Sequence, residues 1–120
     1  MKADVHLASA LIGTGFGYAA ERRREQAVVL LELLPKARDI RRIGSAALDL
    51  GLLAAGRLDA FYEWGLNAWD HSAGALVARE AGARVGGPHG GRESSELHIA
   101  AAPGLYEELA GALREAGGDA

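Results

Sequence analysis

Two carboxylates and one turn of small residues are the parts of this chain whose types and spacing could do chemistry. Asp70 stands in the segment Trp69–Gly74, where a helix over Asp70–Ala81 is expected to begin, and Glu63 lies seven residues earlier. Magnesium prefers hard oxygen ligands, usually one or two carboxylates together with substrate phosphate and water. Asp70 is therefore a candidate magnesium ligand, although an aspartate at a helix start is also an ordinary N-cap.

Glu63 and the turn Gly44-Ser45-Ala46 are candidates for substrate binding. Glu63 closes an expected strand over Leu58–Glu63, and ligands of α/β sheets bind near strand ends. Its carboxylate could accept hydrogen bonds from substrate hydroxyls, or it could simply be solvated. The small residues of the turn would let a ligand reach the N–H groups at the start of the next helix. An ordinary cap by Ser45 explains the same residues.

The elements that must position these residues alternate along the chain. Strands are expected over 8–13, 39–43, 58–63 and 96–102, and helices over 21–34, 46–55, 70–81 and from Pro103 onward. A glycine-rich surface loop is expected over Gly86–Ser95. Alternating strands and helices imply an α/β layer fold with a central sheet. We expect one domain over residues 1–120.

The apolar spacing predicts which helix faces are buried. On the helix over 21–34, and again on the last helix, apolar residues recur with helical periodicity. The helix over 46–55 is apolar on nearly all sides and should be buried, with Asp49 in its first turns as a structural charge that suits the helix dipole. The residues expected to face inward on the first and last helices are Ala27, Leu30, Leu31, Leu34, Leu105, Leu109, Ala112 and Leu113.

Composition excludes several classes of protein. The 120 residues are 49% hydrophobic and 24% charged, with a net charge of −3, which gives no electrostatic argument for binding nucleic acid or an anionic membrane. Cysteine is absent, so disulfides and thiolate zinc sites are excluded. No apolar run reaches the ~20 residues that span a bilayer. A cytoplasmic protein is the default expectation.

A glycine pattern between the first strand and helix offers a competing interpretation. The run Gly15-Phe16-Gly17-Tyr18-Ala19-Ala20 fits the GxGxxA pattern of dinucleotide-binding proteins. That pattern needs an acid at the end of the following strand. The only acid near the expected spacing is Asp39, which lies at the start of its expected strand and not at its end.

Four segments together resemble the inositol monophosphatase family, over essentially the whole chain. They are Leu11-Ile12-Gly13-Thr14-Gly15-Phe16, Ile40 to Leu50 (IRRIGSAALDL), Ala54 to Glu63 (AAGRLDAFYE), and Trp69-Asp70-His71-Ser72-Ala73-Gly74 followed by Glu80-Ala81-Gly82. The match is to the C-terminal half of the family. It implies a layered α/β sandwich, with a mixed central sheet of about five strands and helices on both faces.

The resemblance also implies a function. Family members hydrolyse phosphate monoesters with Mg²⁺, so Asp70 would be a metal ligand. Glu63 would bind hydroxyls of an inositol or sugar phosphate, and the backbone of Gly44, Ser45 and Ala46 would line the same pocket. The other metal ligands of the family lie in a glutamate pair and a DPxDGTxN segment, and this chain contains no DP dipeptide and no DGT.

Two hypotheses follow from these sequence features. In the first, the chain is the C-terminal part of a Mg²⁺-dependent inositol monophosphatase-like enzyme, inactive alone because a single aspartate is too few ligands for a catalytic pair of ions. In the second, it is a non-catalytic remnant that associates with itself or with a partner, since a half-enzyme would expose an apolar face. Expected partners are a second copy or the missing N-terminal half.

Overall fold

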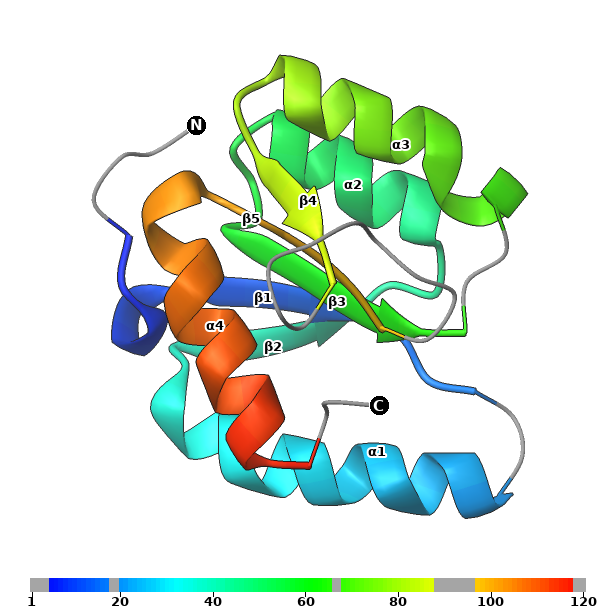
Figure 1. Ribbon diagram of the computed structural model, residues 1–120, viewed down its shortest axis with the longest axis vertical. Helices are drawn as coiled ribbons and strands as arrows, with labels where there is room; N and C mark the ends of the chain where they lie inside the picture. The colour runs from blue at the N-terminus through cyan, green and yellow to red at the C-terminus, as the bar shows by residue number, and fades with distance from the viewer. Residues whose placement is uncertain (1–4, 18–19, 66–67, 88–96, 118–120) are drawn as a thin grey trace.

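A mixed sheet of five strands forms the centre of the computed structural model, in the order β2-β1-β3-β5-β4 (Figure 1). The structure describes residues 5–17, 20–65, 68–87 and 97–117, without the side chains of 68–71. β1, β2 and β3 run parallel, whereas β5 is antiparallel to both β3 and β4. The predicted α/β architecture is confirmed. The strands are β1 Leu11–Thr14, β2 Asp39–Arg42, β3 Ala60–Trp64, β4 Arg84–Gly86 and β5 Leu97–Ala101.

Four helices cover the sheet, α1 and α4 on one face and α2 and α3 on the other (Figure 1). Side chains alternate between the faces of a strand, so Tyr62 of β3 packs in the layer of α1 and α4, whereas Phe61 packs in the layer of α2 and α3. No helix in the described part of the chain is long and apolar enough to cross a membrane. The bounds are α1 Ala20–Leu33, α2 Ala46–Ala54, α3 Ala68–Glu80 and α4 Pro103–Glu115, with short 3-10 helices at Leu7–Ser9 and Leu34–Lys36.

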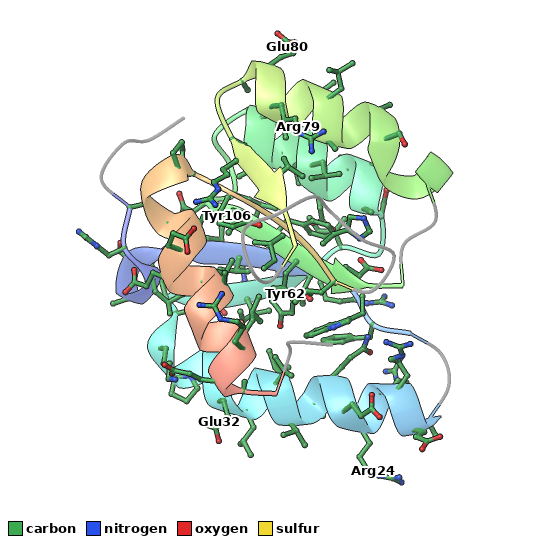
Figure 2. All side chains as sticks on the ribbon, in the orientation of Figure 1. Arg24, Glu32, Tyr62, Arg79, Glu80 and Tyr106 are labelled. Atoms are coloured by element: carbon green, nitrogen blue, oxygen red, sulfur yellow. The ribbon has the colours of Figure 1, made fainter. Side chains whose placement is uncertain are left out.

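The last helix, α4, supplies the largest share of the core on its face of the sheet. Its first residue is Pro103, which suits a first helical position because proline has no N–H to leave unpaired. Leu105, Leu109, Ala112 and Leu113 are all buried, as predicted. Tyr106 joins them and donates its hydroxyl to the carbonyl of Gly87 at 2.6 Å. In Figure 2, Tyr62 and Tyr106 lie inside the molecule, whereas Arg24, Glu32 and Glu80 point outward.

The predicted inward face of α1 is wrong. The buried residues are Gln26, Val29 and Leu33, whereas Leu31 is 71% exposed and Leu34 is 47% exposed. Ala27 is also exposed, and Leu30 is only partly buried. Residues 27–31 are all apolar, so periodicity alone could not choose a face for the C-terminal half of this helix. Gln26 is drawn inward because its side-chain oxygen accepts a hydrogen bond from the Gly17 N–H at 3.0 Å.

The prediction that α2 is buried on nearly all sides is also wrong. Leu50 and Leu53 are buried, but Leu48 is 51% exposed, because α2 has only the sheet and α3 to pack against. The two helices approach closely at Gly74, where a Cβ would lie 2.7 Å from Cδ1 of Leu50 and 2.9 Å from its Cβ. The glycine of the Trp69–Gly74 segment thus has a packing role.

Several element boundaries differ from the sequence-based expectations by more than one residue. The strand expected over 8–13 begins only at Leu11, because a 3-10 turn occupies Leu7–Ser9. The strand expected over 58–63 begins two residues later and extends to Trp64. A short strand that was not expected, β4, pairs with β5. The helix expected to start at Asp70 starts at Ala68. The loop expected over Gly86–Ser95 cannot begin at Gly86, because Gly86 is the last residue of β4, and from residue 88 onward the loop lies outside the described residues.

Candidate functional site

One edge of the sheet collects the residues that were singled out in the sequence. Because β1, β2 and β3 are parallel, their C-terminal ends lie at the same edge. The chain leaves β1 through Gly15–Gly17, leaves β2 through Gly44–Ser45 into α2, and leaves β3 toward the start of α3. Glu63, the Gly44–Ala46 turn and the first turn of α3 are therefore brought to one edge.

The side chain of Glu63 lies directly against the backbone of Gly15. A Cβ placed on Gly15 would overlap the carboxylate, and it would lie 2.5 Å from the Cδ atom of Glu63. Gly15 is buried, whereas Glu63 is partly exposed at the edge. The adjoining residues are held together as well, because the Thr14 hydroxyl donates a buried hydrogen bond of 2.9 Å to the carbonyl of Tyr62. The absence of a side chain at Gly15 thus gives the Glu63 carboxylate its position.

The start of α2 presents backbone N–H groups at this edge. Gly44 has a φ of +91°, a conformation that side chains disfavour, and it turns the chain out of β2. Ser45 is the N-cap, as predicted, and its hydroxyl accepts a hydrogen bond from the Leu48 N–H at 3.2 Å. Helical geometry gives the N–H groups of Ala46 and Ala47 no acceptor within the helix. This helix start could therefore bind an anion.

Asp70 is the third residue of α3, inside the first turn of the helix. The prediction that it caps the helix is wrong, because the helix begins two residues earlier, at Ala68. Its side chain lies outside the described part of the structure, so its role as a metal ligand stays a prediction. A carboxylate in the first turn still interacts favourably with the helix dipole.

Asp49 is a fully buried carboxylate in α2, packed over β1. Both of its carboxylate oxygens lack a hydrogen-bond partner within the described structure. A Cβ on Gly13 would lie 2.8 Å from Oδ1 of Asp49, so the glycine makes room for this side chain. Burial raises the pKa of Asp49 from 3.8 to about 6, since a low-dielectric environment disfavours the charged form. Asp49 was predicted to be a structural charge on a buried helix, and its side chain is fully buried.

Sequence reasoning missed two features of this edge. His98 of β5 is buried and lies opposite Glu63 in the antiparallel pair, on the same face of the sheet. The period-two pattern of the last strand could have placed it there. The partnership of Gly15 and Glu63 had no sequence signal, because the two residues meet only through strand pairing.

The metal and dinucleotide interpretations can be compared with this geometry. Among the described side chains, no group of three or more His, Asp or Glu residues could hold a metal ion. The geometry does not support the dinucleotide interpretation. Asp39 begins β2, whereas the glycine-rich turn follows the end of the parallel strand β1, so the two lie at opposite ends of the strands.

The fold is that of an α/β protein. At the C-terminal ends of its parallel strands lie the Glu63 carboxylate and the starts of α2 and α3. A family model described as "Inositol monophosphatase family" matches residues 1–117. The chain belongs to the inositol monophosphatase family, as its sequence motifs indicated.

Relatives and solved structures agree with this assignment. The chain is 54% identical over 114 residues to inositol-1-monophosphatase SuhB of Mycobacterium tuberculosis, covering 93% of this chain and 39% of that protein. It is 38% identical over 117 residues to Nus factor SuhB of Vibrio cholerae, covering 95% of this chain and 44% of that protein. The structure of the M. tuberculosis SuhB matches with a TM-score of 0.83 over 95% of this chain and 44% of that one, at 53% identity. That of an Anabaena inositol monophosphatase matches with a TM-score of 0.87 over 96% and 48%, at 30% identity. The chain thus spans less than half the length of these relatives.

Proposed function

We propose that this chain is the C-terminal, substrate-binding part of a magnesium-dependent phosphomonoesterase that acts on an inositol phosphate or a related sugar phosphate. The observation that carries the proposal is the Glu63 carboxylate, held against Gly15 at the edge where α2 and α3 begin. Membership of the inositol monophosphatase family and the sequence of the Mycobacterium relative support the same activity.

Each candidate residue has a role that fits its chemistry. The Glu63 carboxylate accepts hydrogen bonds from substrate hydroxyls and so orients the sugar or cyclitol ring. The backbone of Gly44, Ser45 and Ala46 binds the phosphate end of the substrate, because a helix start offers N–H groups and a positive dipole end. Asp70 contributes one carboxylate ligand for Mg²⁺, which when bound would activate water and stabilise the leaving oxygen.

The chain alone should be inactive. A catalytic pair of magnesium ions requires several carboxylates, and this sequence has neither a DP dipeptide nor a DGT segment. With saturating Mg²⁺ and inositol-1-phosphate, release of inorganic phosphate by the 120-residue chain should equal the uncatalysed background. Turnover at ordinary enzyme rates would contradict the proposal that ligands are missing.

Activity should return when the remaining part of the family's length is supplied. We would co-express the chain with a polypeptide comprising the part of the M. tuberculosis SuhB that lies outside the 114 matched residues. In the purified complex, Glu63→Gln should raise KM more than it lowers kcat, because Glu63 contacts hydroxyls and not the reacting phosphorus. Glu80→Gln, at the exposed end of α3, is the matched control. An active complex in which Glu63→Gln changes nothing would remove Glu63 from the site.

A second candidate is a non-catalytic, partner-binding module. Relatives from Vibrio and Pasteurella, at 38% and 42% identity, are named Nus factors, so the names within the family are not limited to phosphatases. This candidate would be favoured if the complex formed but hydrolysed no phosphate monoester at any magnesium concentration.

A further inference from the structure

Glu63 lies where β3 has a partner strand on one side only. β1 pairs with β3 as far as Tyr62, whose register partner is Thr14, whereas β5 continues along β3 to Trp64. Within the described residues, Glu63 is therefore paired with a strand on the β5 side alone. Directly after Trp64 the chain turns at Gly65, whose φ is +78°. The end of a strand that is paired on one side is held less firmly than the centre of a sheet.

The hydroxyl of Thr14 supplies a tie on the other side of β3. Thr14 is fully buried, and its Oγ1 donates a hydrogen bond of 2.9 Å to the carbonyl oxygen of Tyr62. That carbonyl belongs to the peptide group that joins Tyr62 to Glu63. Because a peptide group is planar, an anchor on its oxygen also fixes the direction in which the Cα of Glu63 lies. Thr14 therefore acts on the backbone of Glu63.

The residue that follows Thr14 receives the other end of the same glutamate. A Cβ on Gly15 would lie 2.5 Å from Cδ of Glu63 and 2.9 Å from its Oε2, so the carboxylate lies where a side chain would otherwise be. Two consecutive residues thus define the position of Glu63. Thr14 fixes its backbone, and Gly15 leaves room for its carboxylate.

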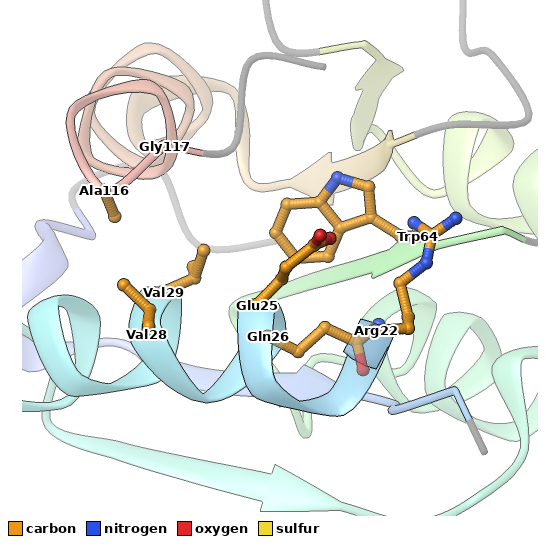
Figure 3. A pocket seen from close by; sticks show the side chains of 8 residues that line it. All are labelled: Arg22, Glu25, Gln26, Val28, Val29, Trp64, Ala116 and Gly117. Atoms are coloured by element: carbon orange, nitrogen blue, oxygen red, sulfur yellow. The ribbon is translucent and has the colours of Figure 1, made fainter. Parts of the chain in front are cut away.

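The turn that contains Gly15 is also anchored at its far end. The Gly17 N–H donates a hydrogen bond of 3.0 Å to Oε1 of Gln26, a buried residue of α1. Gln26 and Trp64 line one cavity of about 280 Å³, between α1 and the end of β3 (Figure 3). The turn is therefore tied to β3 through Thr14 and to α1 through Gln26, so it cannot easily move away from the glutamate.

Packing alone does not require a hydroxyl at position 14. Valine is as well suited to a strand as threonine and would fill nearly the same space. What the threonine adds is the hydrogen bond to the carbonyl of Tyr62. The hydroxyl is thus explained by what it does to the peptide group before Glu63.

We propose that Thr14 is a positioning residue for Glu63, and that Thr14 and Gly15 together set a preference for phosphate monoesters whose hydroxyl groups face Glu63. This role rests on the proposed function, in which the Glu63 carboxylate binds those hydroxyls. Position matters because hydrogen bonds weaken steeply when their geometry is lost. The favoured substrates are cyclitol or sugar phosphates, and the disfavoured ones are monoesters that carry no hydroxyl group.

The first test compares two substrates in the complex with the M. tuberculosis SuhB polypeptide described under the proposed function. Thr14→Val should raise KM for inositol-1-phosphate by roughly threefold to tenfold, which is the effect of one lost hydrogen bond. KM for phenyl phosphate, which has no hydroxyl group, should change less than about twofold. Thr14→Ser keeps the hydroxyl and should restore the KM of the parent.

A double-mutant cycle shows whether Thr14 acts through Glu63. In complexes that already carry Glu63→Gln, Thr14→Val should change KM for inositol-1-phosphate less than about twofold. The control for lost stability is Leu109→Ala, which removes a buried side chain of α4 and should leave the ratio of the two KM values unchanged. A full effect of Thr14→Val in the Glu63→Gln background, or a changed ratio in the control, would overturn the inference.

The second test needs neither substrate nor a second polypeptide. Three-bond NMR couplings in the 120-residue chain report the side-chain torsions of Glu63. The parent and Thr14→Ser should show the couplings of one rotamer, whereas Thr14→Val should show values averaged over several. If Thr14→Val does not fold, Thr14→Cys takes its place, because a thiol is only a weak donor and should change the couplings in the same direction.

The two tests separate this inference from the proposed function. Couplings that stay the same in Thr14→Val, or that change equally in Thr14→Ser, would overturn the inference. If the couplings change as expected but Glu63→Gln leaves KM for inositol-1-phosphate unchanged, the proposed function fails and the positioning of Glu63 by Thr14 stands. If Glu63→Gln raises that KM and Thr14→Val does not, the proposed function stands and the inference fails.

Discussion

The Glu63 carboxylate occupies the space that a side chain on Gly15 would need. Gly15 follows the end of β1 and Glu63 lies in β3, 48 positions later. The two residues meet only because β1 and β3 are neighbours. A residue of the turn after β1 therefore controls the position of a carboxylate on β3. The atoms in contact belong to the flexible end of the Glu63 side chain. This end can rotate away from a side chain introduced at Gly15.

Substituting alanine at three glycines should separate positional from packing effects. Gly15→Ala should cost less than about 1 kcal/mol of unfolding free energy, because Glu63 can rotate away, but it should raise KM in the assembled enzyme. Gly74→Ala should cost about 1–3 kcal/mol, because the Leu50 Cβ cannot rotate away. Gly51→Ala meets nothing within 4 Å and should stabilise α2 by up to about 1 kcal/mol. If urea unfolding showed a larger loss of unfolding free energy for Gly15→Ala than for Gly74→Ala, this expectation would be wrong.

Asp49 should make the chain less stable as the pH rises. The unfolded chain loses this proton near pH 3.8, whereas burial raises the pKa in the folded state to about 6. The folded state holds the proton more tightly, so the unfolding free energy falls between these two pH values, by at most about 3 kcal/mol. Asp49→Asn carries no charge and should be more stable than the parent at pH 7.5.

The measurement for Asp49 is urea unfolding from pH 4 to pH 8. The increase in unfolding free energy of Asp49→Asn over the parent should shrink steadily as the pH falls toward 4. The control is Asp39→Asn on β2, where the aspartate side chain is 49% exposed. In this variant the unfolding free energy should depend on pH as it does in the parent. A gain that is constant with pH would show that burial of the charge is not its cause.

Removing the cap of α2 should weaken the helix start. Ser45→Ala loses the hydrogen bond to the Leu48 N–H and should cost about 1 kcal/mol of unfolding free energy. Ser45→Asp retains a hydrogen-bond acceptor and should therefore keep most of the unfolding free energy that Ser45→Ala loses. Equal losses in the two variants would indicate that the serine hydroxyl has another role.

Magnesium should have little effect on the chain by itself. If the dissociation constant exceeds about 10 mM, adding 10 mM Mg²⁺ stabilises the fold by less than about 0.4 kcal/mol. Asp70→Asn should then respond to magnesium as the parent does. A stabilisation above about 1 kcal/mol that disappears in Asp70→Asn would show that the chain holds the ion alone.

Local signals explain how much of the fold could be predicted. Ser45 and Gly56 mark the ends of α2, and Pro103 with its spaced leucines marks α4, because these patterns act within one helix. The buried face of α1 could not be predicted, since residues 27–31 are all apolar and tertiary packing decided which of them are buried. β4 is only three residues long and had no periodicity to detect.

Only part of the candidate site could be predicted from the sequence. The turn at Gly44–Ala46 and the glutamate at the end of β3 follow from element order, because both must lie at the C-terminal edge of parallel strands. The contact of Gly15 with Glu63 and the burial of Asp49 against Gly13 depend on strand register and helix placement. Those are set by the whole sheet and not by any one segment.

The strand order also constrains how the chain can acquire its structure. β3 lies between β1 and β5, and β4 pairs with β5 although it comes earlier in the sequence. During synthesis, β3 would leave the ribosome well before β5, because β3 ends at Trp64 and β5 begins at Leu97. The middle of the sheet would stay open until residues 97–101 were available, and loop closure over such distances slows folding. A ribosome that stalled before β5 would therefore release an aggregation-prone intermediate with an unpaired strand edge.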